Sequence, residues 1–308
     1  MSHPDRPVLG ILLMLGFCVL APLGDGLAKY IGTAVPLAIL LLVRFGAQVI
    51  LLAPVVAVWG LRWQYSGRVL RLVVYRTLLH IAGIGMMFLS LRFLPLAEAI
   101  AIAFVMPFIM LLLGKYVLGE EVGHRRLIAC VVGFIGTLMV VQPSFAEVGL
   151  PALLPMAVAV VFALFMLVTR QIAQQVDPIA LQAVSGAIAS GILLLAMLLV
   201  GADTGDMALV APPVDLWPLL LVIGIVGTMA HLLMTWALKF APSATLAPMQ
   251  YLEIPFATII GWLFFRDFPN GLAALGIAVT IATGLYIVYR EQLGSRAAKT
   301  LPADPIDP

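Results

Sequence analysis

The feature that most constrains the fold is a series of ten long apolar runs, separated by short segments with charges, glycine or proline. A bilayer core of about 30 Å needs roughly 20 apolar residues per helix, which is about the length of these runs. Backbone groups in lipid must bond within the chain, and β-barrel alternation is absent, so we expect helices. They span residues 8–30, 36–58, 72–91, 95–117, 126–142, 151–172, 179–200, 215–238, 243–265 and 271–289.

Composition supports this interpretation, because 63% of the 308 residues are apolar and only 10% are charged. Such a chain has too little polar surface to cover a soluble particle. The first apolar run is also longer than the apolar region of a signal peptide, and further runs follow it. The sequence therefore predicts an all-α, polytopic membrane protein with ten transmembrane helices.

An internal repeat divides these helices into two sets of five, because residues 91–120 and 238–267 carry the same pattern. The matched pairs include Arg92 with Lys239, Pro95 with Pro242, Gly114 with Gly261, and Glu120 with Asp267. Five is odd, so the second copy must enter the membrane from the opposite side, which makes the halves inverted repeats. We expect one domain with halves 1–142 and 150–290, joined at 142–149, and a disordered cytoplasmic tail over 291–308.

The basic residues predict the orientation of the bundle. With the N-terminus inside, most lysines and arginines fall in cytoplasmic segments, and only Lys29, Arg92 and Arg266 fall at outer ends. Positive charge is retained on the cytoplasmic side of membrane proteins. Both termini are therefore expected in the cytoplasm.

Glu253 is the most informative charge, since it lies near the middle of the ninth expected helix. An ionisable group there costs about 2.5–3.5 kcal/mol on insertion scales. Gln250 lies one turn earlier, and Pro248 and Pro255 bracket the site, where they loosen backbone hydrogen bonds. We expect Glu253 to face a central cavity, where it binds a substrate donor or carries a coupling proton. The alternative is a structural hydrogen bond to a neighbouring helix.

Other charges lie near the expected outer surface. Glu98 either lines an outer vestibule or is simply solvated. Asp25 and Lys29 are one turn apart, which favours a surface ion pair. The alternative for these two residues is an outer gate that closes against Glu98 or Arg92.

Two arginines lie within expected helices. Arg44 is too deep for a surface charge and is expected to form a fixed ion pair with Asp25 or Glu98. Arg76 is nearer the cytoplasmic end, where it is expected to extend to lipid headgroups.

Histidines and aromatic residues complete the candidates. His80 and His231 either shuttle protons, because imidazole titrates near neutral pH, or form single hydrogen bonds to neighbouring helices. Aromatic walls for a planar substrate, or ordinary packing, are the two interpretations of Trp236, Tyr251, Phe88, Phe104 and Phe165.

Motifs of other classes are missing from the sequence. There is no nucleophile paired with a base, no H-E-x-x-H, no Walker loop and no clustered basic patch. We therefore expect no catalytic residues, enzyme activity, cofactor, metal site or nucleic-acid partner. A polytopic enzyme acting on lipid-linked substrates and a non-transporting scaffold are the rival classes.

The ordered, duplicated motifs resemble the EamA family of the drug/metabolite transporter superfamily. They are Leu94-Pro95, Pro107 and Leu118-Gly119-Glu120, answered by Ala241-Pro242, Pro255, Gly261 and Phe264-Phe265-Arg266-Asp267. The family's usual Glu is Asp267 here, which keeps the carboxylate. The resemblance implies a secondary transporter in the bacterial inner membrane that moves a small organic metabolite by alternating access.

Residues 24–30 and 251–255 look more like a subgroup that includes riboflavin and S-adenosylmethionine uptake proteins. An amino-acid or drug exporter of the same fold is the alternative. Membrane lipid and a small-molecule substrate are the implied partners. The sequence leaves open proton coupling, the direction of transport, and whether the protein is a monomer or a homodimer.

Overall fold

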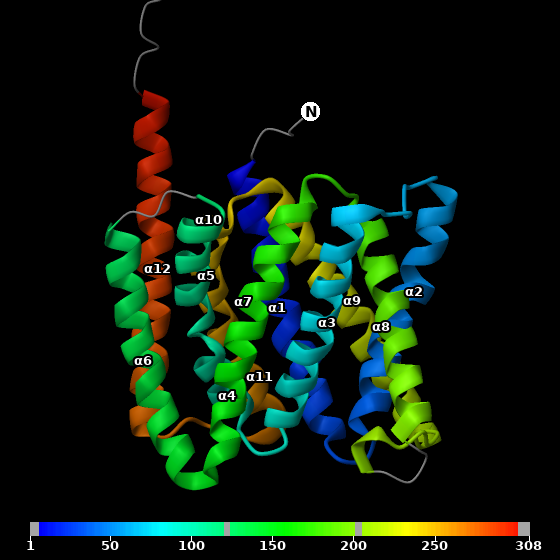
Figure 1. The fold of residues 1–308 in the computed structure, drawn as a ribbon. Helices are drawn as coiled ribbons and strands as arrows, with labels where there is room; N and C mark the ends of the chain where they lie inside the picture. Colours follow the sequence, from blue (N-terminus) through cyan, green and yellow to red (C-terminus); the bar gives the residue numbers. More distant parts are fainter. Residues whose placement is uncertain (1–5, 120–123, 201–204, 301–308) are drawn as a thin grey trace, which may run out of the picture.

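The computed structural model describes residues 6–119, 124–200 and 205–300, and every regular element within these ranges is helical. Most of the helices run roughly side by side and form a bundle (Figure 1). They are α1 Pro7–Ile31, α2 Leu37–Val58, α3 Gly67–Ser90, α4 Leu96–Ala103, α5 Met106–Val117, α6 His124–Val148, α7 Leu154–Ala173, α8 Pro178–Val200, α9 Trp217–Phe240, α10 Ser243–Leu246, α11 Glu253–Phe265 and α12 Gly271–Thr300. Short 3-10 helices are η1 Leu150–Leu153, η2 Gly205–Met207, η3 Val214–Leu216 and η4 Ala247–Leu252.

Length and hydropathy confirm a multi-pass membrane protein. Within the described ranges, eight helical segments are long and apolar enough to cross a membrane, and two shorter apolar helices, Met249–Phe265 and Gly271–Thr283, accompany them. Many large apolar side chains remain exposed, as a lipid-facing surface requires.

Two of the expected helices are interrupted. The expected helix 95–117 is divided into α4 and α5, and the expected helix 243–265 is divided into α10, η4 and α11. Pro107 lies at the start of α5 and Pro248 at the start of η4, where the missing N–H of proline costs no helical hydrogen bond. Both halves of the chain are thus broken in the corresponding helix.

Two helices extend beyond their expected ends. α6 continues past residue 142 and through Pro143 to Val148, and the chain turns at Gly149, the last residue of the expected junction, whose φ of 70° suits glycine. α12 extends to Thr300, into the segment expected to be disordered. Glu120 and residues 301–308 lie outside the described residues.

Helix packing pairs one half of the chain with the other. α1 packs on α9, α2 on α8, α3 on α7, α4 on α11 and α6 on α12. The beginning of α1 and the end of α12 lie at the same end of the bundle, which we call the terminal end (Figure 1). The other end, the loop end, carries the α1–α2 and α3–α4 connections.

Candidate functional site

A cavity with about 630 Å³ of empty space, part of it open, lies between the two halves. Helices α1, α2, α3, α7, α9 and α11 and the α4–α5 break contribute to its walls. The lining residues are Phe17, Leu20, Ala21, Gly24, Asp25, Arg44, Ile84, Met87, Phe88, Phe104, Met106, Val158, Phe162, Gly227, Ala230, His231 and Glu253.

Glu253 is placed in this cavity by the break in the ninth expected helix, because it is the first residue of α11. Its side chain is 8% exposed, and Asp25 lines the same cavity from α1. Neither carboxyl group has a hydrogen bond or an ion pair within the described part of the chain. The cavity therefore contains two carboxyl groups that are available to interact with a bound solute or a proton.

Arg44 also lines the cavity, but its hydrogen-bond partner is not the expected one. Its Nη2 lies 2.9 Å from Nδ1 of His231, and the packing of α2 against α9 leaves Glu98 elsewhere. Asp25 is near enough for its charge to interact with that of Arg44, although no ion pair forms between them among the described residues. The expectation of a fixed ion pair with Asp25 or Glu98 is therefore wrong.

The two histidine rings lie in contact at the cavity wall, which His231 lines. Their ring centroids are 4.3 Å apart, although His80 comes from α3 and His231 from α9. Arginine can only donate, so His231 Nδ1 accepts from Arg44 and its N–H lies on Nε2. That Nε2 and both ring nitrogens of His80 are buried and have no hydrogen-bond partner among the residues that the structure describes. Buried polar atoms of this kind are rare in native proteins and call for a functional explanation.

Arg76 is fully buried and does not extend to lipid headgroups, so that expectation is wrong. Its guanidinium donates to Oγ1 of Thr169 and Oγ of Ser185, both at 2.9 Å, and more weakly to Oγ1 of Thr235 at 3.4 Å. These three hydroxyls come from α7, α8 and α9, so Arg76 joins α3 to three helices of the second half.

A continuous column connects Arg76 to the cavity. The Arg76 guanidinium lies 4.6 Å from the ring centroid of Phe165, and that ring lies 4.6 Å from His80. His80 contacts the ring of His231, which in turn binds Arg44. The column therefore connects α3 and α9 with the guanidinium in the cavity.

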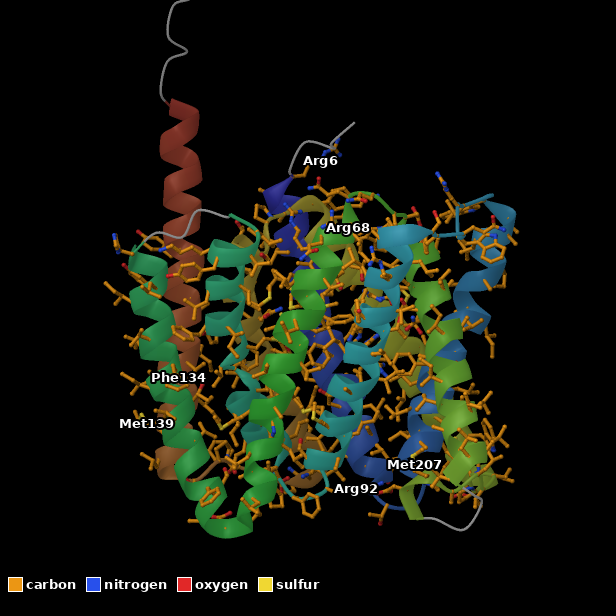
Figure 2. All side chains as sticks on the ribbon, viewed as in Figure 1. Arg6, Arg68, Arg92, Phe134, Met139 and Met207 are labelled. Carbon is orange, nitrogen blue, oxygen red and sulfur yellow. The ribbon has the colours of Figure 1, made fainter. Side chains whose placement is uncertain are left out.

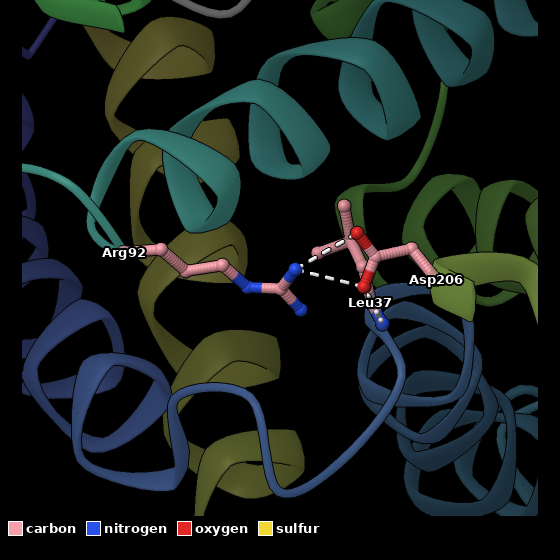
Figure 3. Close-up of polar contacts among 3 residues, drawn as sticks. All are labelled: Leu37, Arg92 and Asp206. Atoms are coloured by element: carbon pink, nitrogen blue, oxygen red, sulfur yellow. Dashed lines mark hydrogen bonds and ion pairs between the residues drawn. The ribbon is translucent and has the colours of Figure 1, made fainter.

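Ion pairs lie at the loop end of the bundle. Lys29 Nζ lies 3.7 Å from Asp267 and donates to the carbonyl of Leu94 at 2.6 Å, so the expected ion pair with Asp25 is wrong. Nearby, Arg92 makes two contacts of 2.8 Å with the carboxylate of Asp206 (Figure 3). These contacts connect loops from both halves beyond the cavity.

Four further candidates do not line the cavity. Glu98 is buried rather than solvated and accepts a 2.6 Å hydrogen bond from Ser144 of α6. Gln250 is fully buried with Nε2 3.0 Å from the sulfur of Met166. Tyr251 is also fully buried, with its ring 5.4 Å from Phe104, whereas Trp236 packs on an apolar cluster of α2, α8 and α9.

Sequence reasoning found Phe88 and Phe104 but missed Phe17 and Phe162, which also line the cavity. Phe17 lies two turns before Asp25, with Ala21 between them at intervals of four residues. Counting back from Asp25 four residues at a time identifies the face of α1 that lines the cavity.

Gly227 makes room for the Arg44 guanidinium, because a Cβ at this position would clash with Arg44 Nη1. We expect Gly227→Ala to displace Arg44 from His231 and to lower stability by about 1–3 kcal/mol, the usual cost of overpacking. Gly46→Ala is the matched control, since no atom lies within 4 Å of its added Cβ. Midpoints of heat-induced unfolding in detergent measure both. Equal midpoints would contradict the tight contact.

These features define a class of protein: a multi-pass membrane protein with a cavity between two halves and ionisable groups inside the bilayer region. The model of the EamA-like transporter family matches residues 8–142 and 149–290. The chain belongs to this family, and it is a membrane transporter.

Curated relatives agree with this assignment. A riboflavin transporter of Rhizobium johnstonii is 28% identical over 96% of this chain and 95% of its own length, and one of Brucella anthropi is 27% identical over 86% and 93%. An S-adenosylmethionine uptake transporter of Rickettsia prowazekii is 24% identical over 92% and 93%. One crystal structure, 17% identical, shares the fold with a TM-score of 0.66 over 96% of this chain and 98% of that one.

Proposed function

We propose that the protein is a secondary transporter of the bacterial inner membrane that moves a small organic metabolite through the central cavity by alternating access. The observation that carries this proposal is the cavity itself, whose walls come from both halves and contain Asp25, Arg44 and Glu253. The relatives named for riboflavin and for S-adenosylmethionine uptake indicate the size and type of solute.

Alternating access by two inverted repeats of five helices fits the packing pairs. Exchange of the two halves turns the pair α1 and α9 into the pair α7 and α3, and both pairs pack together. The pairs α2 with α8 and α6 with α12 are each returned to themselves, and the pair α4 with α11 becomes the pair of α10–η4 with α5, which also packs together. Rocking one half against the other around a fixed site then exposes the cavity to each side in turn.

One contact occurs twice and supports the same inversion. Lys29, at the end of α1, donates to the carbonyl of Leu94, and Arg170, at the end of α7, donates to the carbonyl of Leu238, both at 2.6 Å. Each acceptor lies shortly before a proline that precedes a broken helix, but the two contacts lie at opposite ends of the bundle. An inverted duplication accounts for both.

The terminal end is assigned to the cytoplasm. Arg6 and Arg68 lie at this end, whereas Arg92 lies at the loop end (Figure 2). Asp206 and Asp267 also lie at the loop end, where they pair with its few basic residues. Because positive charge tends to stay inside, this distribution supports the proposed cytoplasmic location of both termini.

Glu253 is the group that carries the coupling proton or binds a donor of the solute, and the His80–His231 pair is the second candidate for proton handling. Arg44 connects the two, because it lines the cavity and binds His231.

The test is a thermal-shift screen of the purified protein against riboflavin, S-adenosylmethionine, nucleosides and amino acids, followed by flux in reconstituted vesicles. A ligand at 100 times its Kd stabilises the folded state by about 2.7 kcal/mol. We expect riboflavin or S-adenosylmethionine to raise the midpoint and to be transported. Transport of none of these compounds would contradict the proposal.

A further inference from the structure

The cavity lining contains more acidic than basic side chains. Its lining contains two carboxyl groups, Asp25 and Glu253, and one guanidinium, Arg44, which is held by His231. Asp25 interacts electrostatically with both Arg44 and Glu253. Even with Arg44 set against Asp25, the carboxyl group of Glu253 is not offset by any basic side chain of the cavity lining.

A carboxyl group that is only 8% exposed and has no partner needs a positive charge or a proton, because the apolar surroundings replace none of its hydration. Lys29, which lies one turn after Asp25 on α1, is engaged at the loop end with Asp267 and the Leu94 carbonyl. The described residues thus leave the Glu253 site free for a cation that enters with the solute.

The other walls suit a positive charge attached to a flat group. Four phenylalanines, Phe17, Phe88, Phe104 and Phe162, line the cavity from α1, α3, the α4–α5 break and α7. The faces of aromatic rings attract cations by about 0.5–2 kcal/mol, most strongly where water is excluded. Aromatic rings also stack on planar groups.

We propose that this cavity selects a solute that carries a positive charge beside a planar ring, with Glu253 and Asp25 as its charge-recognising residues. This inference rests on the proposed transport function and narrows its substrate class. S-adenosylmethionine has a sulfonium cation and an adenine ring, whereas riboflavin has a planar ring and no cation. The acidic and aromatic lining of the cavity suits a cationic solute such as S-adenosylmethionine better than it suits riboflavin.

The experiment compares S-adenosylmethionine with S-adenosylhomocysteine, which keeps the ring and the amino-acid group but lacks the sulfonium methyl and its charge. Titration calorimetry on the purified protein gives both Kd values, with riboflavin as the uncharged planar probe. We expect S-adenosylmethionine to bind at least about tenfold more tightly than S-adenosylhomocysteine, equivalent to about 1.4 kcal/mol. Riboflavin is expected to bind more weakly than either.

Substitutions test which residues cause the difference in affinity between S-adenosylmethionine and S-adenosylhomocysteine. Glu253→Gln and Asp25→Asn are each expected to reduce the ratio of the two Kd values at least threefold. The matched control is Glu98→Gln, which removes a buried carboxylate outside the cavity and should keep the ratio. Elution of each variant as a monodisperse peak in size-exclusion chromatography checks its folding.

Three results would overturn the inference: equal or tighter binding of S-adenosylhomocysteine, tighter binding of riboflavin, or no binding of S-adenosylmethionine. Riboflavin flux together with any of these would leave the proposed transport function intact and remove only the charge selectivity. Absence of both binding and flux for all three compounds would contradict both proposals.

Discussion

Replacing Glu253 by glutamine is expected to leave the protein folded and to reduce solute uptake at least about tenfold, equivalent to a transport barrier raised by about 1.4 kcal/mol. The substitution preserves shape, and the carboxyl group has no hydrogen-bond partner in the described structure that folding could lose. It removes the charge that faces the solute and the group that can take up and release a proton. The largest effect should therefore be on transport rather than on stability.

Uptake into vesicles is measured between about pH 5 and pH 8, the range in which protonation changes matter physiologically. Glu98→Gln is the control, because Glu98 is also buried but bonds to Ser144 outside the cavity. This control should lower the unfolding midpoint, since the charge-assisted hydrogen bond is weakened, while retaining uptake. Unchanged uptake by Glu253→Gln over the whole pH range would exclude Glu253 from both roles.

The sequence predicted the helices well because their length and apolarity are dictated by the bilayer. Where the helices break was less predictable. Pro107 and Pro143 both lie in apolar runs, yet the helix is interrupted near Pro107 and continues through Pro143 to Val148. A proline permits a break, but the packing of neighbouring helices decides whether the backbone leaves the helix.

The ionisable members of the site were predictable for the opposite reason. Asp25, Arg44, His231 and Glu253 are conspicuous because polar groups are expensive in apolar runs. The structure brings all four to one cavity, although Asp25 and Arg44 were expected to form structural or gating ion pairs. The phenylalanine walls were only half predicted. An apolar residue among apolar residues carries no signal until the helices are placed around the cavity.

The ion-pair and hydrogen-bond partners of the charged side chains were the least predictable feature. Lys29 was matched with Asp25 on its own helix but pairs with Asp267, and Arg44 binds His231, which lies 187 residues away. Local spacing shows only which groups can meet within one helix. The choice among distant partners depends on which helices pack together, here α2 on α9 and α1 on α11.

Arg76→Ala is expected to destabilise the protein by about 3 kcal/mol, the second large effect. The change removes three hydrogen bonds to hydroxyls and the contact with Phe165, and it leaves a cavity where a fully buried side chain had been. Large-to-small substitutions at such positions cost about 2–5 kcal/mol. The stability of Arg76→Lys should lie between that of the unsubstituted protein and that of Arg76→Ala. Lysine keeps the charge but cannot reach Thr169, Ser185 and Thr235 together.

The control is Arg68→Ala in the same helix, since Arg68 is exposed at the terminal end (Figure 2) and should change stability by less than about 0.5 kcal/mol. Heat-induced unfolding in detergent ranks the three variants. If Arg76→Ala were as stable as Arg68→Ala, the guanidinium would contribute nothing to holding α3 against α7, α8 and α9. The column from Arg76 to the cavity would then lack its anchor, and a structural link between the terminal end and Arg44 would have to be abandoned.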